Sequence, residues 1–327
     1  MNTRVNTGIA APLALRPARG YWGRMWVYLR EMYPLPARFV TAMLLYLSFT
    51  LLLAAIQGRR PLWEFSWILL GGLGGFLLAF ILRLMDELKD SLIDRQLFPE
   101  RPVPSGRVTL TDIRITLWAT GALFLLLHLN AGAAMFSATA LLAYSLLMFR
   151  YFFLSPRWKS KLLVNLATHN PVVAVLLLHY IVLFALQYGI PWGDLRLELL
   201  VPVGMYWFLL LSWELCRKVR YREEETDYQT YSRIFGPVGA VAVAWCVQTL
   251  AVGAGLFVAS TGGLSVAYLV VLLAAYAWLI RGEVRFLTRK LASGRPLCAT
   301  AEQFAGLVMS AAFIEFVFQA VWRHGLS

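Results

Sequence analysis

Met85-Asp86-Glu87-Leu88-Lys89-Asp90-Ser91-Leu92-Ile93-Asp94 directly follows an apolar segment, residues 64–84, that is long enough to cross a membrane. Acidic residues at the end of such a segment are costly in lipid and are usually functional. Asp86, Asp90 and Asp94 recur every four residues, which on one helix predicts a row with about 6 Å between neighbours. A row of like charges requires a cation.

The composition of the chain indicates a polytopic membrane protein. Of its 327 residues, 59% are apolar and only 15% are charged, far from the balance of soluble proteins. A membrane span needs roughly 20 mainly apolar residues. We therefore predict an all-α protein with nine transmembrane helices, at residues 36–56, 64–84, 110–128, 132–154, 163–187, 198–216, 237–259, 264–280 and 300–321.

The first 35 residues are expected to form a cytosolic segment with an interfacial helix around residues 21–33, followed by a single transmembrane domain, residues 36–327. This N-terminal segment is rich in arginine but lacks the apolar core of a signal peptide. Cys216, Cys246 and Cys298 are far apart in the sequence and odd in number, so we expect no disulfide framework.

The distribution of charge predicts the orientation. With a cytosolic N-terminus and nine spans, 26 of the 30 Lys and Arg residues lie on the inner side, and only Arg59, Arg60, Arg196 and Arg323 lie outside. This asymmetry is a strong positive-inside signal. We expect a multi-pass protein of a bacterial inner membrane with its C-terminus outside. Orientation also accounts for the net charge of +12, so no nucleic-acid partner is expected.

Two inner segments, residues 85–109 and 214–236, are long and rich in charge. Mg²⁺ typically binds through one or two carboxylates and through phosphate oxygens of a substrate. Arg101 and Arg107 lie on a proline-rich stretch that follows the first acidic run, and guanidinium groups grip such anions. A diphosphate beneath apolar helices predicts an apolar tail, that is, an isoprenyl diphosphate.

At these residues the chain resembles the UbiA superfamily of intramembrane prenyltransferases. The family's first motif, Asn-Asp-x-x-Asp-x-x-x-Asp followed by Arg-Pro-Leu-x-x-Gly, reads here Asp86-Glu87-x-x-Asp90-x-x-x-Asp94 and then Arg101-Pro102-Val103-Pro104-Ser105-Gly106. The substitutions at Asp86 and Glu87 keep oxygen ligands but change charge and reach. The resemblance implies a nine-helix bundle with both acidic loops on one side.

The second motif of the family fits less well. The family has Asp-x-x-x-Asp, whereas here the first acid is best matched by Glu214, and Lys218 stands at the fourth position after it. The family's Tyr-x-x-x-Lys is also broken, because Tyr144 is followed by Met148, with Arg150 as the nearest cation. These departures affect the positions that are expected to bind the diphosphate.

The residues and the resemblance together imply a site with Mg²⁺ as cofactor. Catalytic roles are expected for Asp86, Asp90, Asp94 and Glu214. Metal ligands are expected among Asp86, Glu87, Asp90, Asp94, Glu214, Glu223 and Asp227. Diphosphate contacts are expected from Arg101, Arg150, Arg217 and Lys218. A carbocation would be stabilised by aromatic faces such as Trp118, Tyr144, Trp207 and Trp213.

The predicted function is Mg²⁺-dependent transfer of an isoprenyl group from a prenyl diphosphate to a lipophilic or aromatic acceptor. One alternative is a membrane terpene cyclase of the same superfamily, acting on farnesyl or geranylgeranyl diphosphate. Another is a divalent-cation transporter, although transporter sites usually lie near the midplane of the bilayer rather than at one face. Simpler interpretations are ion-paired acids at a helix end for Asp86, Asp90 and Asp94, and a solvated loop for Glu223, Glu224 and Glu225.

Overall fold

The computed structural model describes residues 20–150, 152, 161–225, 229–291 and 295–324. Within these residues every regular element is helical. The α-helices are α1 (Tyr21–Met32), α2 (Leu35–Ile56), α3 (Phe65–Ile68), α4 (Gly74–Lys89), α5 (Ser91–Leu97), α6 (Leu110–His128), α7 (Ala133–Phe149), α9 (Leu162–His169), α10 (Val172–Gln187), α11 (Leu200–Cys216), α12 (Tyr231–Gly262), α13 (Val266–Leu287) and α14 (Arg295–His324). Short turns of other helix types are the π-helical Leu69–Leu73 and the 3₁₀ turns Trp192–Asp194, Leu197–Leu199 and Arg222–Glu224.

The predicted membrane-spanning architecture is confirmed. Among the described residues, eight helical segments are long and apolar enough to cross a membrane, and α7 is a shorter apolar helix of 17 residues at the position of the remaining predicted span. The predicted start of one span at residue 237 coincides with a kink inside α12, where Gly236 has a φ of 70° and is followed by Pro237. Another span is divided into α9 and α10 at Pro171.

The helix ends follow from local sequence. Thr109 caps α6 and forms a capping box with Asp112, which satisfies backbone N–H groups that the first turn leaves open. Ser265 caps α13, and Gly263 ends α12 in the left-handed conformation that glycine adopts at low cost. These caps place the connections between spans at the ends of the bundle.

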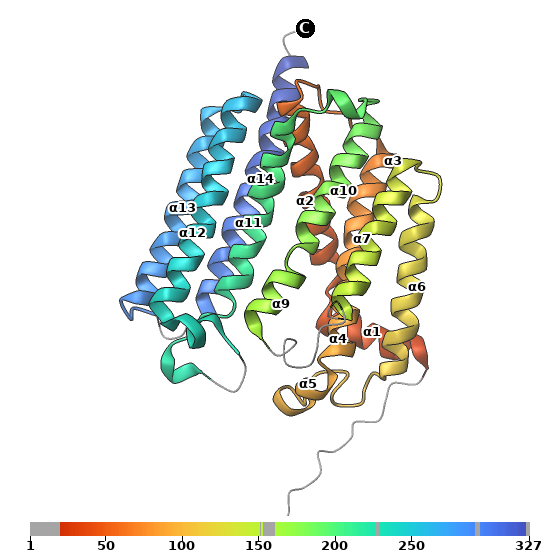
Figure 1. The fold of residues 1–327 in the computed structure, drawn as a ribbon, viewed down its shortest axis with the longest axis vertical. Coiled ribbons are helices and arrows are strands. Elements are labelled where there is room, and N and C mark those ends of the chain that lie inside the picture. The colour runs from red at the N-terminus through yellow and green to blue at the C-terminus, as the bar shows by residue number, and fades with distance from the viewer. Residues whose placement is uncertain (1–19, 151, 153–160, 226–228, 292–294, 325–327) are drawn as a thin grey trace, which may run out of the picture.

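The buried side chains form two hydrophobic cores. One joins α1, α4, α6 and α7, and the other joins α2 with α10 to α14. Figure 1 shows α5, α9 and the segment after α11 at one end of the bundle, while the C-terminus lies at the other. We call the end that carries α5 and the segment after α11 the motif end.

The glycine run in residues 71–75 permits close packing rather than opening space between helices. A Cβ at Gly71 would collide with the ring of Tyr46, one at Gly72 with the sulfur of Met43, and one at Gly75 with the hydroxyl of Tyr180. The rings of Tyr46 and Tyr180 meet edge to face with centroids 5.0 Å apart. The interior at this level is therefore filled by aromatic side chains from α2 and α10.

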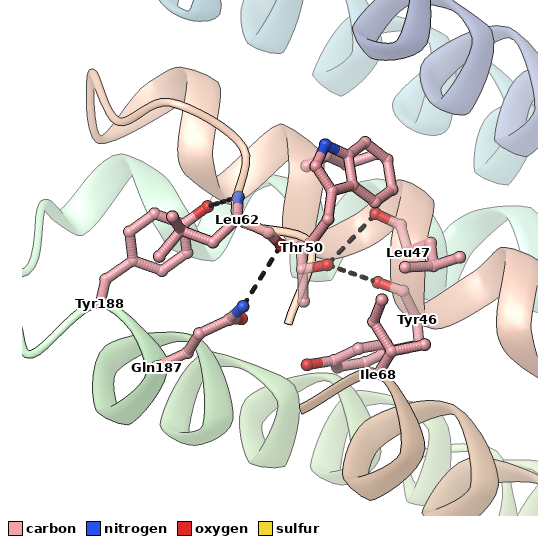
Figure 2. Close-up of a pocket in the computed structure, with 9 residues that line it drawn as sticks. Tyr46, Leu47, Thr50, Leu62, Ile68, Gln187 and Tyr188 are labelled. Carbon is pink, nitrogen blue, oxygen red and sulfur yellow. Dashed lines mark hydrogen bonds between the residues drawn. The ribbon is translucent and has the colours of Figure 1, made fainter. Parts of the chain in front are cut away.

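The end opposite the motif end is closed by polar contacts to the chain between α2 and α3. The Tyr188 hydroxyl accepts a hydrogen bond from the Leu62 N–H at 2.9 Å, and Gln187 Nε2 donates to the Leu62 carbonyl at 3.3 Å (Figure 2). The cavity beside them has a volume of about 10 Å³. This is the space of a single water molecule, so the cavity is too small for a substrate.

Candidate active site

The first acidic stretch forms two helices rather than one. The last residue of α4 is Lys89, and Asp90 joins α4 to α5 with a φ of −94° and a ψ of 6°. The prediction of Asp86, Asp90 and Asp94 in a row on a single helix is therefore wrong. Like charges four residues apart destabilise a helix, and the Ser91 hydroxyl donates at 3.3 Å to the Leu88 carbonyl in the last turn of α4.

The three aspartates of this stretch have different surroundings. Asp86 forms an ion pair with Lys89 at 3.0 Å, and its side chain is 47% exposed. Asp94 is buried and forms an ion pair with Arg101 at 3.2 Å. Within the described residues Asp90 has no ion pair, and burial is the main cause that raises the pKa of its carboxyl, while Lys89 and Lys218 oppose the increase.

Glu87 lies in a buried network behind the aspartates. Its side chain is 2% exposed and forms an ion pair with Arg83, one turn earlier on α4. Tyr28 of α1 is fully buried close to Arg83, and burial raises the pKa of its hydroxyl. A role for Glu87 as a metal ligand therefore requires this ion pair to open.

The proline-rich stretch after α5 forms a compact turn that separates its two arginines. The guanidinium of Arg101 stacks over the ring of Phe98 at 3.7 Å while it contacts Asp94. Gly106 has a φ of 78°, which favours glycine, and the Val108 N–H closes the turn on the Pro102 carbonyl at 3.0 Å. Arg107 instead forms an ion pair with Glu31 of α1 at 2.5 Å.

The second acidic stretch combines one carboxylate with cations of the same helix end. Glu214 forms ion pairs with Arg217 and, at 3.1 Å, with Lys218. The carbonyl of Lys218 accepts a hydrogen bond from the Tyr231 N–H at 3.0 Å, and Arg217 lies over the ring of Trp213 at 5.2 Å. The resulting group is positive.

The consecutive glutamates of the second loop make structural contacts. Glu223 is exposed and forms an ion pair at 3.0 Å with Arg289, which follows the end of α13, and this pair lowers the pKa of the Glu223 carboxyl. Glu224 accepts from the Tyr221 N–H at 3.0 Å, and Glu225 accepts from the Thr230 hydroxyl at 2.6 Å. The structure thus places Glu223 at the outside of the loop, and Asp227 lies outside the described residues.

The two charged stretches come together at the motif end. Asp90 of the first stretch interacts electrostatically with Lys218 of the second. His169, at the end of α9, interacts electrostatically with Asp86, Lys89 and Lys218. The sequence offers one local signal for this position of His169, the polar pair His169-Asn170 just before Pro171.

The other predicted site residues are more scattered. Arg150 is exposed at the end of α7. Trp118 is 69% exposed on α6, so the prediction that its ring stabilises a carbocation inside the bundle is wrong. Tyr144 donates to the Thr168 carbonyl at 3.0 Å, and Trp207 donates to Asn170 Oδ1 at 2.5 Å, so both rings connect their helices to the region of α9 and α10.

The donor set of the first stretch fits a hard divalent cation. Carboxylate oxygens are the ligands that Mg²⁺ prefers, and Asp86, Asp90 and Asp94 provide them beside α9. Within the described part of the chain, no three His, Cys, Asp or Glu residues form a ready-made metal group. Such a set fits an ion that shares its coordination between one or two carboxylates and the oxygens of a phosphate ligand.

An apolar helical bundle with converging charged loops at one end defines an integral membrane protein with a site at the rim of its spanning helices. The model of the UbiA prenyltransferase family matches residues 42–299, and the chain belongs to this family. Among curated proteins, no relative matches the chain by sequence.

Two solved structures share the fold. A UbiA homologue from Aeropyrum pernix K1 has a TM-score of 0.62 and 17% sequence identity, covering 86% of this chain and 98% of its own. A structure described under digeranylgeranylglyceryl phosphate synthase has a TM-score of 0.59 and 15% identity, covering 90% of this chain and 99% of its own. At these identities the likeness concerns the fold.

Proposed function

We propose that this protein is a Mg²⁺-dependent intramembrane prenyltransferase that transfers an isoprenyl group from a prenyl diphosphate to a lipophilic or aromatic acceptor. The observation that carries the proposal is that a carboxylate-rich loop and a cation-rich loop lie at the same end of an apolar bundle, where Asp90 interacts electrostatically with Lys218. The carboxylates would bind Mg²⁺, the cationic side chains would bind the diphosphate, and the apolar helices would accommodate the isoprenyl tail.

The loops differ in the chemistry that they offer to such a substrate. Asp86, Asp90 and Asp94 would hold Mg²⁺, which when bound withdraws charge from the leaving diphosphate. Lys218 and Arg217 would bind the diphosphate oxygens, with Glu214 orienting both through its ion pairs. Arg101, held by Asp94 and by the ring of Phe98, is within the first loop and would contribute from that side.

The orientation of the site follows from charge. The motif end carries the charged loops and most of the cations of the chain, so the positive-inside rule supports a cytosolic site with the C-terminus outside. A cytosolic site would receive a water-soluble diphosphate head group from the aqueous side, while its tail enters the bilayer.

The test measures release of diphosphate by protein purified in lipid nanodiscs and supplied with geranyl, farnesyl or geranylgeranyl diphosphate and Mg²⁺, in the presence and in the absence of lipophilic or aromatic acceptors. The wild type is expected to release diphosphate, and Asp90→Asn, which keeps size but removes charge, is expected to lower kcat/KM by about 100-fold or more. Glu198→Gln is the matched control, because Glu198 forms an ion pair with Arg196 at the opposite end of the bundle.

The products distinguish the competing functions. Consumption of the prenyl diphosphate only when an acceptor is present supports transfer. A cyclic hydrocarbon or a terpene alcohol formed without an acceptor would establish a terpene cyclase instead. If no prenyl diphosphate is consumed while vesicles containing the protein accumulate a divalent cation, the enzyme proposal fails.

A further inference from the structure

A second buried polar cluster lies inside the bundle, away from the substrate-facing groups described above. Glu283 of α13 is completely buried within a spanning helix and belongs to no ion pair among the described residues. Gln248 Nε2 of α12 donates to Glu283 Oε1 at 2.7 Å and to the Ser212 hydroxyl of α11 at 3.0 Å. The Cys216 thiol donates to the same Glu283 oxygen at 3.5 Å.

The cluster joins three helices at the last turn of α11. Ser212 and Cys216 are four residues apart and so lie on one face of α11. Glu214 and Lys218, which belong to the second charged loop, alternate with them in the same stretch of chain. Any shift of the buried face of this turn therefore moves the groups that face the site.

The same helix, α13, also holds the loop that follows. The ring of Tyr221 stacks on Phe286 with centroids 4.3 Å apart and an interplanar angle of 10°. Its hydroxyl donates to the Phe286 carbonyl at 2.9 Å. The chain from Ser212 to Tyr221 is thus attached to α13 at two levels, by the Glu283 cluster inside the bundle and by Tyr221 near its end.

We propose that Glu283 is a positioning residue, which fixes the last turn of α11 through Cys216 and Gln248 and thereby sets Glu214 and Lys218 against Asp90. A carboxyl in this place is costly in lipid, and an apolar side chain of similar size would pack at lower cost. Its hydrogen bonds define one register between α11, α12 and α13, because a buried polar group that loses its partner is strongly disfavoured. The kinetic part of the test rests on the proposed prenyl-transfer function.

The test compares Glu283→Leu and Glu283→Gln with a control at the other end of the bundle. Glu315 of α14 is also a buried carboxyl, but it accepts from the Ser265 N–H at 2.9 Å at the start of α13. Glu315→Leu therefore disturbs the same helix by removal of a buried carboxyl without touching α11. All variants are made in a background with Cys246→Ser and Cys298→Ser, so that Cys216 is the sole remaining thiol.

The first readout is the rate at which a small maleimide labels Cys216, which is 1% exposed. Glu283→Leu is expected to increase this rate at least about 10-fold, and Glu283→Gln, which can still pair with Gln248, is expected to stay near the parent. Glu315→Leu is expected to lower the melting temperature without faster labelling. Equal labelling in Glu283→Leu and Glu315→Leu would overturn the proposal.

The second readout is kinetic. Glu283→Leu is expected to raise the KM for the prenyl diphosphate about 10-fold with a smaller change in kcat, and Glu283→Gln is expected to restore the parent value. If Glu283→Leu does not fold, Gln248→Met is used instead, because it removes the hydrogen bond between α12 and Glu283. The same changes in labelling rate and in KM are then expected of Gln248→Met. If the wild type consumes no prenyl diphosphate, the proposed function fails, while the labelling rates still decide the role of Glu283.

Discussion

The two charged loops of the motif end are built on opposite plans. The first contains five carboxylates, four of them in its acidic stretch (Asp86, Glu87, Asp90 and Asp94), and is backed by a charged network that includes Arg83. The second places one carboxylate, Glu214, beside Arg217 and Lys218. It is backed by the Glu283 cluster, in which Gln248 donates to Glu283 and to Ser212, and the Cys216 thiol donates to Glu283. One loop collects negative charge at the site, and the other collects positive charge.

This difference bears on how a family motif diverges. Where the resemblance leads one to expect an acid in the second loop, Lys218 pairs with Glu214 one turn earlier. A cation there turns a potential metal ligand into a potential diphosphate contact. We infer that the first loop binds the metal ion and that the second loop binds the diphosphate. The variants described below test this assignment.

The largest effect is expected when the two loops are altered separately. Asp94→Asn should raise the Mg²⁺ concentration required for half-maximal activity and lower kcat/KM by about 100-fold, because an oxygen ligand loses its charge. Lys218→Gln should raise the KM for the prenyl diphosphate about 10-fold and leave the Mg²⁺ requirement unchanged, because a charge-assisted contact is lost. Steady-state kinetics at varied Mg²⁺ measures both.

The assignment of metal binding to the first loop would be contradicted if variants of both loops changed the Mg²⁺ requirement. If Lys218→Gln shifts the Mg²⁺ requirement as strongly as Asp94→Asn does, both loops act on the ion. Lys218→Asp, which restores the acid that the family motif has there, then serves as the sharper probe. An increase in activity in that variant would show that the second loop also binds metal.

The sequence predicted the spans well because bilayer thickness requires long apolar runs, which can be counted directly. It also predicted that the charged segments 85–109 and 214–236 lie at one end, since an even number of crossings separates them. The break at Asp90 was missed, because four-residue spacing continues through it: the Asp94 N–H donates to the Asp90 carbonyl at 2.9 Å as in a continuous helix.

Features that depend on contacts between distant segments were beyond the sequence. The ion pair of Glu87 with Arg83 follows helical spacing, but its burial depends on Tyr28 of α1. The packing of the Tyr46 ring against Gly71 depends on how α2 crosses the π-helical turn Leu69–Leu73. The sequence does not distinguish Glu223 from the neighbouring glutamates, because its ion-pair partner, Arg289, lies after the distant helix α13.

An intermediate effect on stability is expected from the charged network behind the first loop. Arg83→Leu leaves Glu87 buried without its partner and should lower the free energy of unfolding by about 2 kcal/mol. This cost is smaller than that of breaking a fully buried ion pair, because Arg83 is 29% exposed. The double variant Arg83→Leu/Glu87→Leu should recover most of the loss, since no buried charge remains.

Thermal unfolding in nanodiscs measures this cycle. The Glu283 cluster behind the second loop should behave differently, because Gln248→Met removes hydrogen bonds rather than one partner of an ion pair, at a smaller cost. If the double variant at Arg83 and Glu87 is no more stable than Arg83→Leu alone, the pair does not explain the burial of Glu87. The ion pair of Arg83 and Glu87 would then not differ in its effect on stability from the Glu283 cluster behind the second loop.

The smallest effect is expected at the surface ion pairs that attach each loop to a neighbouring segment of the chain. Arg107 holds Glu31 of α1, mainly by a hydrogen bond that lowers the pKa of the Glu31 carboxyl. A lowered pKa in the folded state contributes stability above the usual range of Glu, and this contribution disappears as the pH falls through the lowered value. Glu31→Gln should therefore cost less than about 1 kcal/mol at pH 7, because the carboxylate is partly exposed.

The corresponding pair of the second loop, Arg289 with Glu223, is exposed on both sides, with side chains 61% and 66% accessible. Glu223→Gln should therefore have a smaller effect than Glu31→Gln, and raised salt should remove the remaining difference from the wild type. Unfolding measured at pH 7 and near pH 4 tests both variants, and the cost of Glu31→Gln should shrink at the lower pH. A larger cost for Glu223→Gln than for Glu31→Gln would mean that the second loop depends on its surface anchor rather than on the buried cluster of Glu283.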